Sequence, residues 1–500
     1  MRSSPVSRCR MHCYFETGSP MCGGGTRTVF SKRRAGSGVL SPVREGSTLT
    51  HGAQKGSISN YEVYLGALVG TLLGAAPAVL ADNPIIQTLY STDPAPYVWN
   101  DTVWLFTGHD EPNSDWFTMK DWRLFSSTDM VNWRDWGKMM SVETFSWASA
   151  DAWAGQVIER NGKFYYYVPV TRKGSSMGIG VGVSDSITGP YKDAIGAPLV
   201  ANSAIDPTVW IDDDGQAYLY WGNPNLYYIK LNEDMISYSG GINTVDLSSF
   251  QGHFEEAPWL YKRDSTYYLA YAGHCCSEDL RYSTAPGPTG PWTYRGQVMP
   301  TQGSSFTNHP GIIDYKDGSY LFYHNGALPG GGGFTRSVAV EKFEYGSDGS
   351  IPTMDMTTEG APQIAPLDPY ARVEAETIAF SSGLSTEPSS DGGGIHVTSI
   401  SNGDYIKVKG VGFGDSGAAS VSLRVAAANG GAKVELRLGS RTGAVIASCS
   451  VDATGGADVW KTISCPLSGS ATGQQDLFFN FVGGGDQNLF KFNWWQFARK

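Results

Sequence analysis

Between residues 93 and 343 the chain alternates apolar and polar positions in short runs rich in Val, Ile, Tyr, Phe and Trp. This alternation is typical of half-buried β-strands. Asn-Gly, Asp-Gly or Asp-Ser pairs separate neighbouring runs, as at Asn161-Gly before Lys163-Phe-Tyr-Tyr-Tyr. Such pairs favour tight hairpin turns, so the pattern predicts an all-β domain built from hairpins.

The strand pattern repeats along the chain. The five units start at Asp93, Trp153, Asp206, Glu256 and His309, at spacings of 60, 53, 50 and 53 residues. Repeats of this length with several short strands are typical of propeller blades. The sequence therefore predicts a five-bladed β-propeller, in which equivalent strand starts face one central channel.

A proline-rich stretch at 362–369 separates a second β pattern from the first. Three prolines in this stretch predict a stiff linker. Beyond it, turns rich in Gly, Ser and Ala separate short alternating strands such as Lys433-Val-Glu-Leu-Arg-Leu. This pattern predicts a β-sandwich of the jelly-roll type. We expect the propeller at 82–361 and the sandwich module at 370–500.

The first 81 residues differ from the rest of the chain. Residues 1–60 are rich in Ser, Gly and Arg without periodicity, which predicts disorder or a mistaken gene-start extension. Residues 61–81 are apolar, and Val-Leu-Ala before Asp82 is typical of a signal-peptidase site. We therefore expect a secreted, extracellular protein. An internal signal anchor is the alternative, which Pro77 and the small residues disfavour.

Composition and charge indicate which classes of molecule this protein binds. Aromatic residues reach 12% while charged residues are only 17%, and pyranose faces stack on such rings. Residues 1–81 carry a net charge of +6, which leaves −17 on residues 82–500. An acidic body disfavours nucleic acid and anionic membranes. We expect a monomer that acts on a largely neutral polysaccharide, without a stable membrane partner.

The cysteines are consistent with an oxidising compartment. Cys449 and Cys465 stand in what look like neighbouring strands, which predicts a disulfide. Cys275 and Cys276 are adjacent and either form a vicinal disulfide or stay reduced. A glycosylation sequon begins at Asn100, in a predicted hairpin turn.

Three carboxylates stand at equivalent points of the repeats. Asp93 lies in Ser91-Thr-Asp-Pro, Asp206 in Ala204-Ile-Asp-Pro, and Glu256 in Phe254-Glu-Glu-Ala-Pro. Converging carboxyl groups are the residues that commonly catalyse cleavage of a glycosidic bond. Glu255 is the alternative to Glu256, and strand alternation sends the two side chains to opposite faces. Only one of them can therefore line the channel.

These motifs resemble a known family. Together with Thr107-Gly-His-Asp-Glu111 and Phe125-Ser-Ser-Thr-Asp-Met-Val-Asn-Trp133, they make residues 85–360 similar to glycoside hydrolase family 43, above all its arabinoxylan arabinofuranohydrolase branch. Residues 370–500 resemble carbohydrate-binding module family 6, through Val373-Glu-Ala-Glu-Thr, Gly403-Asp-Tyr-Ile and the closing Phe-Asn-Trp-Trp-Gln-Phe.

The resemblance implies an inverting hydrolase that needs no cofactor for its chemistry. Asp93 is then the general base that activates water, and Glu256 is the general acid that protonates the leaving oxygen. Asp206 orients this acid and raises its pKa. The implied substrate is arabinoxylan, trimmed of its α-L-arabinofuranosyl side chains. The alternatives are a β-xylosidase, an arabinan-acting enzyme and a non-catalytic, lectin-like propeller.

Further candidates for substrate contact lie at the predicted strand starts and loops. They are Trp99, Trp153, Trp210, Asn308, His309, His324 and Arg336. The tryptophans could equally pack in the blades, and Arg336 could be a solvated side chain. His324 resembles a family position near the propeller centre that can associate with a metal or water, and a core histidine is the alternative.

The C-terminal module departs from its family. The aromatic residue expected after Thr454-Gly-Gly is replaced by Ala457, which removes one side of the usual sugar sandwich. Tyr405 and Asn488 remain as sugar-binding candidates. Glu376 and Asn493 are expected to hold a structural calcium, with one charge lost because Asn493 stands where the family has Asp.

Overall fold

The computed structural model describes residues 78–203, 205–251, 253–484 and 488–500, which lie in one compact unit, Pro77–Lys500. The predictions made for residues 1–77 lie outside the described residues. The described chain is almost entirely β-structure, and its one helix is a single 3₁₀ turn, η1 (Val142–Thr144). Within these ranges, no helix is long and apolar enough to cross a membrane.

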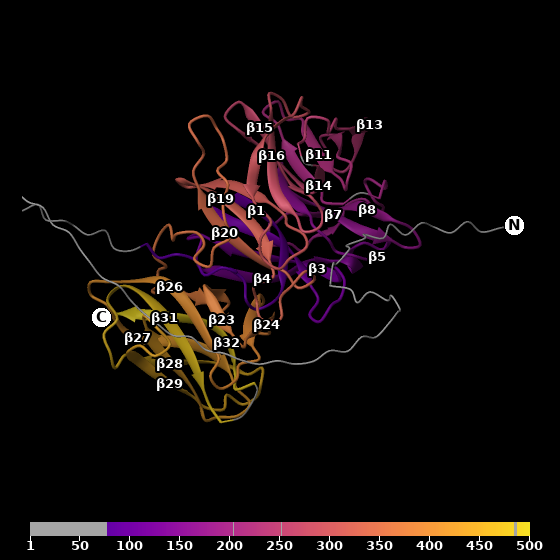
Figure 1. Cartoon of the computed structure of the whole chain (residues 1–500). Coiled ribbons are helices and arrows are strands. Elements are labelled where there is room, and N and C mark those ends of the chain that lie inside the picture. Colours follow the sequence, from indigo (N-terminus) through magenta and orange to yellow (C-terminus); the bar gives the residue numbers. More distant parts are fainter. Residues whose placement is uncertain (1–77, 204, 252, 485–487) are drawn as a thin grey trace, which may run out of the picture. The chain divides into compact units, whose positions relative to one another are not determined.

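Each repeat folds into its own antiparallel sheet (Figure 1). The first sheet contains β1 (Ser91–Trp99), β2 (Thr102–Asp110), β3 (Met119–Ser127) and β4 (Trp133–Ser141). The second contains β5 (Ala148–Ala150), β6 (Gln156–Arg160), β7 (Lys163–Arg172), β8 (Met177–Ser184) and β9 (Lys192–Asp193).

The remaining three repeats follow the same plan of short hairpin-linked strands. The third sheet contains β10 (Thr208–Ile211), β11 (Ala217–Trp221), β12 (Tyr227–Leu231) and β13 (Tyr238–Thr244). The fourth contains β14 (Phe254–Arg263), β15 (Thr266–Gly273), β16 (Asp279–Ala285) and β17 (Thr293–Met299). The fifth contains β18 (Gly311–Tyr315), β19 (Gly318–Asn325) and β20 (Ser337–Phe343).

Apolar side chains from four of the repeats meet in one central cluster. Phe106, Tyr166, Trp259 and Leu321 belong to different sheets and are each at most 3% exposed. Burying a side chain of this size stabilises the fold by about 1.5–3 kcal/mol. The inward face of each alternating strand therefore holds the sheets around a shared core.

The segment before β1 pairs the beginning of the propeller with its last repeat. Ile85 N donates to Val338 O at 2.9 Å, and Ala81 N donates to Ala361 O at 2.7 Å. Ala81 is fully buried, and Val79 O accepts a hydrogen bond from the backbone of Gln363. Residues 79–81 thus supply backbone hydrogen bonds and buried surface to the fold.

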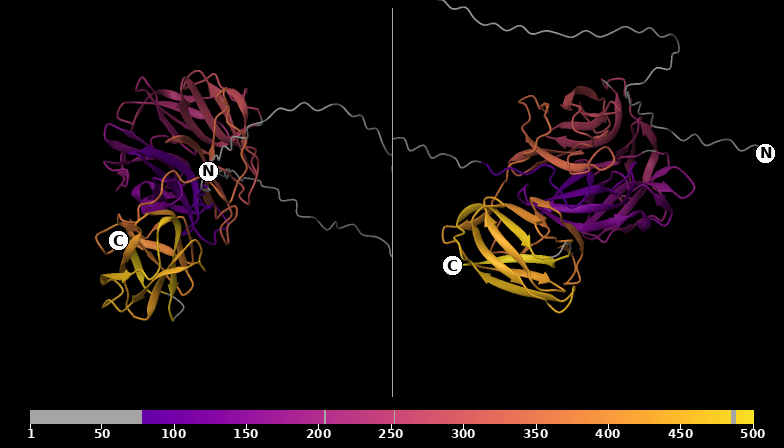
Figure 2. Two further views of the ribbon diagram at one scale, coloured as in Figure 1. Left: turned by 90° about the vertical axis from the view of Figure 1, so that its left-hand side faces the viewer. Right: turned by 60° about the horizontal axis from the view of Figure 1, so that its bottom comes forward.

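The strands after residue 373 form the sandwich, drawn in orange to yellow (Figure 2). One sheet contains β24 (Ser385–Pro388), β25 (Ile395–Thr398), β32 (Lys491–Arg499), β27 (Ala418–Ala426) and β30 (Trp460–Pro466), with β21 (Val373–Glu374) paired to β32. The other contains β23 (Phe380–Ser382), β26 (Tyr405–Gly414), β31 (Gly473–Val482), β28 (Ala432–Leu438) and β29 (Val445–Val451).

Both predicted cysteine pairs are disulfide-bonded. Cys449 and Cys465 join β29 of one sandwich sheet to β30 of the other, with sulfur atoms 2.10 Å apart. Cys275 and Cys276 form a vicinal disulfide in the loop after β15. The first of these bonds joins the edge strands of the two sandwich sheets, and both of its cysteines are buried.

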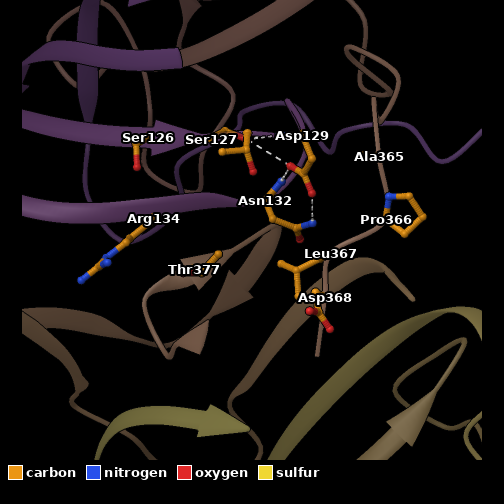
Figure 3. Close-up of a pocket in the computed structure, with 11 residues that line it drawn as sticks. Ser126, Ser127, Asp129, Asn132, Arg134, Ala365, Pro366, Leu367, Asp368 and Thr377 are labelled. Carbon is orange, nitrogen blue, oxygen red and sulfur yellow. Dashed lines mark hydrogen bonds between the residues drawn. The ribbon is translucent and has the colours of Figure 1, made fainter. Parts of the chain in front are cut away.

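The propeller and the sandwich share a strand and a buried polar contact. β22 (Thr377–Ile378) pairs with β4 as the fifth strand of the first sheet. Asn132 Nδ2 donates to Lys409 O, and Lys409 N donates to Asn132 Oδ1, both at 2.9 Å. Asp129 Oδ2 accepts a hydrogen bond of 2.6 Å from Asn132 Nδ2. Figure 3 shows this pair of side chains. The module is therefore fixed to the propeller by more than the linker.

We expect Asn132→Ala to lower the free energy of unfolding by about 1–3 kcal/mol, because it leaves the buried N–H of Lys409 unpaired and removes one of the two hydrogen bonds to the Lys409 C=O. Calorimetric unfolding of the full chain measures this loss. Asn243→Ala is the matched control, since the Asn243 side chain is exposed and its hydrogen bonds, to Gly241 O and Tyr228 O, lie within the third sheet and away from the junction. Equal melting temperatures for the two variants would contradict this account of the junction.

Candidate active site

The sequence motifs that carry the acids share an unusual backbone conformation. Asp93, Asp206 and Ala257 each precede a proline and have φ angles of 49°, 58° and 56°. Non-glycine residues adopt this left-handed region at a cost of about 1–3 kcal/mol, which the surrounding structure must offset. In the first and fourth sheets, strand register shifts at the same points. Such bulges re-aim side chains, here the carboxyl groups.

The structure brings the three predicted acids together. Asp93, Asp206 and Glu256 are 7%, 5% and 8% exposed, although their sheets are separate. Asp206 Oδ2 accepts a hydrogen bond of 3.0 Å from Ala257 N, next to Glu256. Burial raises the pKa of Asp206 well above its ordinary value, and the charges of Glu256 and Asp93 raise it further. The three groups therefore form one electrostatic unit.

Asp93 is held as a carboxylate. Arg336 Nη1 donates to Asp93 Oδ1 at 3.0 Å, and Asp93 N donates to His324 Nδ1 at 3.2 Å. Burial alone would raise the pKa of Asp93, but Arg336 and His324 outweigh it and hold this pKa well below its ordinary value. An ionised carboxylate at neutral pH can accept a proton from water.

Glu256, by contrast, favours its protonated form. Burial raises the pKa of Glu256 to about 7, the charges of Asp93 and Glu255 add to the rise, and a hydrogen bond from Asn223 opposes it. Asn223 Nδ2 lies 2.6 Å from Glu256 Oε2. Glu255 is partly exposed and accepts a hydrogen bond from the Cys275 backbone. Of the two adjacent glutamates, Glu256 is the one that can hold a proton inside the site.

Arg336 is buried rather than solvated. Its exposed fraction is 4%, and its Nε and Nη2 atoms donate to the Asp110 carboxylate at 2.9 and 2.8 Å. The Arg336 backbone N–H also donates to Asp110 at 2.8 Å. Asp110 thus fixes the Arg336 guanidinium, whose positive charge keeps Asp93 ionised.

His324 lies beside Asp93 but is closed to substrate. It is fully buried, its Nε2 contacts Thr307 O at 2.8 Å, and its Nδ1 accepts the Asp93 N–H. Because both ring nitrogens are engaged, the expected contact with sugar or metal is replaced by a positioning role toward Asp93.

Asn308 and His309 lie behind the acids. Asn308 Oδ1 accepts hydrogen bonds from His309 N at 3.0 Å and His324 N at 3.3 Å. Burial lowers the pKa of His309 to about 4, although the charge of Asp93 opposes this shift. His309 is therefore neutral across the neutral pH range, and Asn308 organises the backbone around it.

Only one of the three predicted tryptophans is linked to the acids, through Phe117 and Arg336. Trp153 Nε1 donates to Phe117 O at 2.9 Å, and the Phe117 ring faces Arg336. Trp99 is at the opposite end of β1 from Asp93 and packs against Phe164, with ring centroids 5.3 Å apart. Trp210 is partly buried against the cluster between the third and fourth sheets. Trp99 and Trp210 are packing residues.

Sequence reasoning missed Asn223, Asp110 and Glu278. Asp110 stands inside the quoted Thr107-Gly-His-Asp-Glu motif, which was its only signal. Glu278 is 3% exposed, and its Oε2 accepts the Asn308 N–H at 2.7 Å. Within the described residues its Oε1 has no hydrogen-bond partner. Burial and Glu256 raise the pKa of Glu278 well above its ordinary value, so it adds a fourth acid beside the other three.

The sugar-binding candidates of the sandwich lie apart from these acids in the fold. Tyr405 packs on Phe380 at 6.3 Å, and Arg441 lies 4.2 Å from the Tyr405 ring centroid. One face of this ring is therefore covered by a guanidinium. Asn488 is exposed in the loop before β32.

Glu376 and Asn493, the expected calcium ligands, have different partners in the structure. Burial raises the pKa of Glu376 well above its ordinary value, and Arg134 Nε lies 3.6 Å from its carboxyl group. Asn493 Nδ2 instead donates to Asp391 at 2.9 Å. The part of the chain that the structure describes holds no group of three or more His, Cys, Asp or Glu side chains suited to a metal ion. Both carboxylate oxygens of Glu376 are buried without a hydrogen-bond partner among the described residues, and the structural calcium stays a prediction.

Both parts of the chain match family models. Residues 81–351 match Glycosyl hydrolases family 43, and residues 374–499 match Carbohydrate binding module (family 6). The chain is 36% identical to an arabinoxylan arabinofuranohydrolase of Bacillus subtilis (strain 168), over 84% of this chain and 92% of that protein. It is 30% identical to a xylosidase/arabinosidase of Bacteroides ovatus, over 53% of this chain and 95% of that protein.

A solved structure shows the same similarity in three dimensions. The crystal structure of a glycoside hydrolase family 43 arabinoxylan arabinofuranohydrolase from Bacillus subtilis, in complex with cellotetraose, has a TM-score of 0.74 and 34% identity. The match covers 85% of this chain and 99% of that chain. These similarities confirm the predicted family resemblance and the predicted fold class, a β-propeller followed by a β-sandwich.

The pKa of Glu256 predicts the alkaline limit of activity. A general acid must be protonated to donate, so kcat/KM should fall above pH 7, by roughly tenfold per pH unit. Asp93 stays ionised throughout the working range because its pKa is held low. Hydrolysis of an aryl glycoside between pH 4 and pH 9 measures this profile. An alkaline limb centred near the ordinary pKa of a free glutamate would show that Glu256 is not the acid.

Asn223→Ala should shift this limb to higher pH. The Asn223 hydrogen bond favours the ionised form of Glu256, so its loss raises the pKa of Glu256 further. We also expect kcat to fall about tenfold, because the acid loses its orientation. The same pH series measures both effects. A limb that moves to lower pH, or does not move, would contradict this role of Asn223.

Proposed function

The chain belongs to glycosyl hydrolases family 43, and from this premise we propose that it removes α-L-arabinofuranosyl side chains from arabinoxylan. The observation that carries the proposal is the opposite electrostatic setting of two carboxyl groups. Arg336 keeps Asp93 ionised, while burial raises the pKa of Glu256 to about 7 and so keeps Glu256 protonated below that pH. The similarity to an arabinoxylan arabinofuranohydrolase over most of the chain supports the choice of substrate.

The proposed reaction is a single displacement. Asp93 takes a proton from a water molecule, and the water oxygen forms a bond to the anomeric carbon. The bond from that carbon to the glycosidic oxygen breaks, and Glu256 gives its proton to the leaving oxygen. Attack from the face opposite the leaving group inverts the anomeric centre. Asp206, beside Glu256, orients the acid and shares in its electrostatics.

A β-xylosidase is the second candidate. The relative named xylosidase/arabinosidase matches about half of this chain, which supports either sugar as the unit cleaved. The similarity that extends through the sandwich module favours the first candidate, because polysaccharide binding is useful to an enzyme that trims a polymer.

We further propose that the enzyme is secreted and acts as a monomer on xylan-type polysaccharide. The apolar segment at 61–81 and the Cys449–Cys465 disulfide support an oxidising, extracellular compartment. The acidic body supports a neutral polysaccharide as partner and disfavours nucleic acid.

Incubation of the full chain with wheat arabinoxylan should release arabinose as the main monosaccharide, as resolved by anion-exchange chromatography. Glu256→Ala is the control and should release none, because no other group donates the proton. Proton NMR during the first minutes should show the β-anomer of the freed sugar. Release of xylose would favour the second candidate. No sugar from the wild-type chain would leave the lectin-like alternative.

A further inference from the structure

The loop between β2 and β3 displays a tryptophan to solvent. Trp116 is 49% exposed, and it is the only aromatic residue among the large hydrophobic side chains that the described structure leaves exposed. The loop is nevertheless held in one conformation. Ser114 Oγ donates to Trp116 O at 2.6 Å, and Thr118 N donates to the same oxygen at 2.7 Å. An exposed ring on a pinned backbone is prepared for a ligand at little cost in entropy.

Two phenylalanine rings contact Trp116, and a third packs on one of them. Its ring centroid lies 5.5 Å from that of Phe117 and 6.1 Å from that of Phe334. Phe334 packs in turn on Phe117 at 4.8 Å and on Phe306 at 5.1 Å. We call these four residues the aromatic rim. Because the rim joins loops of the first and the last repeat, it forms only when the propeller is closed.

The aromatic rim is continuous with the acids. The Arg336 guanidinium lies 5.0 Å from the Phe117 ring centroid, and the same guanidinium binds Asp93. Trp153, the one predicted tryptophan beside the site, donates to the Phe117 backbone. The rim therefore leads from the general base outward to solvent.

The chemistry of the aromatic rim indicates which kind of ligand it binds. Aromatic faces attract the C–H faces of pyranose rings, and a rim without a charged side chain suits a neutral chain. An enzyme that removes a side chain must also hold the polymer from which that side chain branches. We propose that the aromatic rim binds a pyranosyl residue of the polysaccharide backbone, while the branching sugar enters the pocket between Asp93 and Glu256. This inference rests on the proposed function.

The test compares a polymer with a substrate that fills only the pocket. Trp116→Ala should raise KM for arabinoxylan about tenfold, the effect of losing one stacked ring. It should change kcat/KM for methyl α-L-arabinofuranoside, whose aglycone has no ring, by less than about twofold. Trp116→Phe should restore much of the affinity for the polymer. Ile242→Ala is the control, because Ile242 is 40% exposed on β13 and is not in the rim.

The outcomes separate this inference from the proposed function. Equal losses on both substrates, or no loss on either, would overturn the backbone-binding role of the rim. If the wild-type chain hydrolyses neither substrate, the proposed function fails first. The rim is then judged by xylan affinity electrophoresis of Glu256→Ala and of Glu256→Ala with Trp116→Ala, which share the same sandwich module. Weaker retention of the double variant would support the rim, and equal retention would overturn it.

Discussion

The active site depends on the contact between the first and the last repeat. The Asn83 side chain bonds both the N–H and the C=O of Val340, and Ile85 bonds Val338, so the segment just before β1 lies along the fifth sheet. This pairing places Asp93 against Arg336, a residue 243 positions later. An ionised carboxylate is costly to bury without a counter-charge, and it takes up a proton instead. Closure of the propeller thus decides the ionisation state of Asp93.

The same closure distinguishes two carboxyl groups that look alike in the sequence. Asp93 receives a guanidinium and a histidine nitrogen, whereas Glu256 receives only the amide of Asn223. Their environments push the two pKa values apart, which is how one site holds an acid and a base at one pH. Burial and the charges of Asp93 and Glu255 favour the protonated form of Glu256. The division of roles follows from position rather than from residue type.

The sandwich module is part of this architecture. β22 extends the sheet that contains β1, and the Lys409 backbone is bonded to Asn132 in the turn before β4. Lys409 Nζ also bonds Asp82, so the module reaches the segment that closes the propeller. A binding module that is hydrogen-bonded to the catalytic domain cannot move independently as a flexibly linked one does.

The sequence by itself determined the strands, the repeats and the three acids. Alternation and hairpin pairs are local signals, and each acid stands at or next to the residue before a proline, within one short motif. Only the tertiary structure shows that Asn223 and Asp110 serve the site, that both ring nitrogens of His324 are engaged inside the protein, and that Trp153 reaches Arg336 through Phe117. These facts depend on which side chains meet across 30 to 240 residues of chain, as at Asn223–Glu256 and Arg336–Asp93. A two-residue strand period says which face a side chain occupies, but closure of the sheets chooses its neighbour.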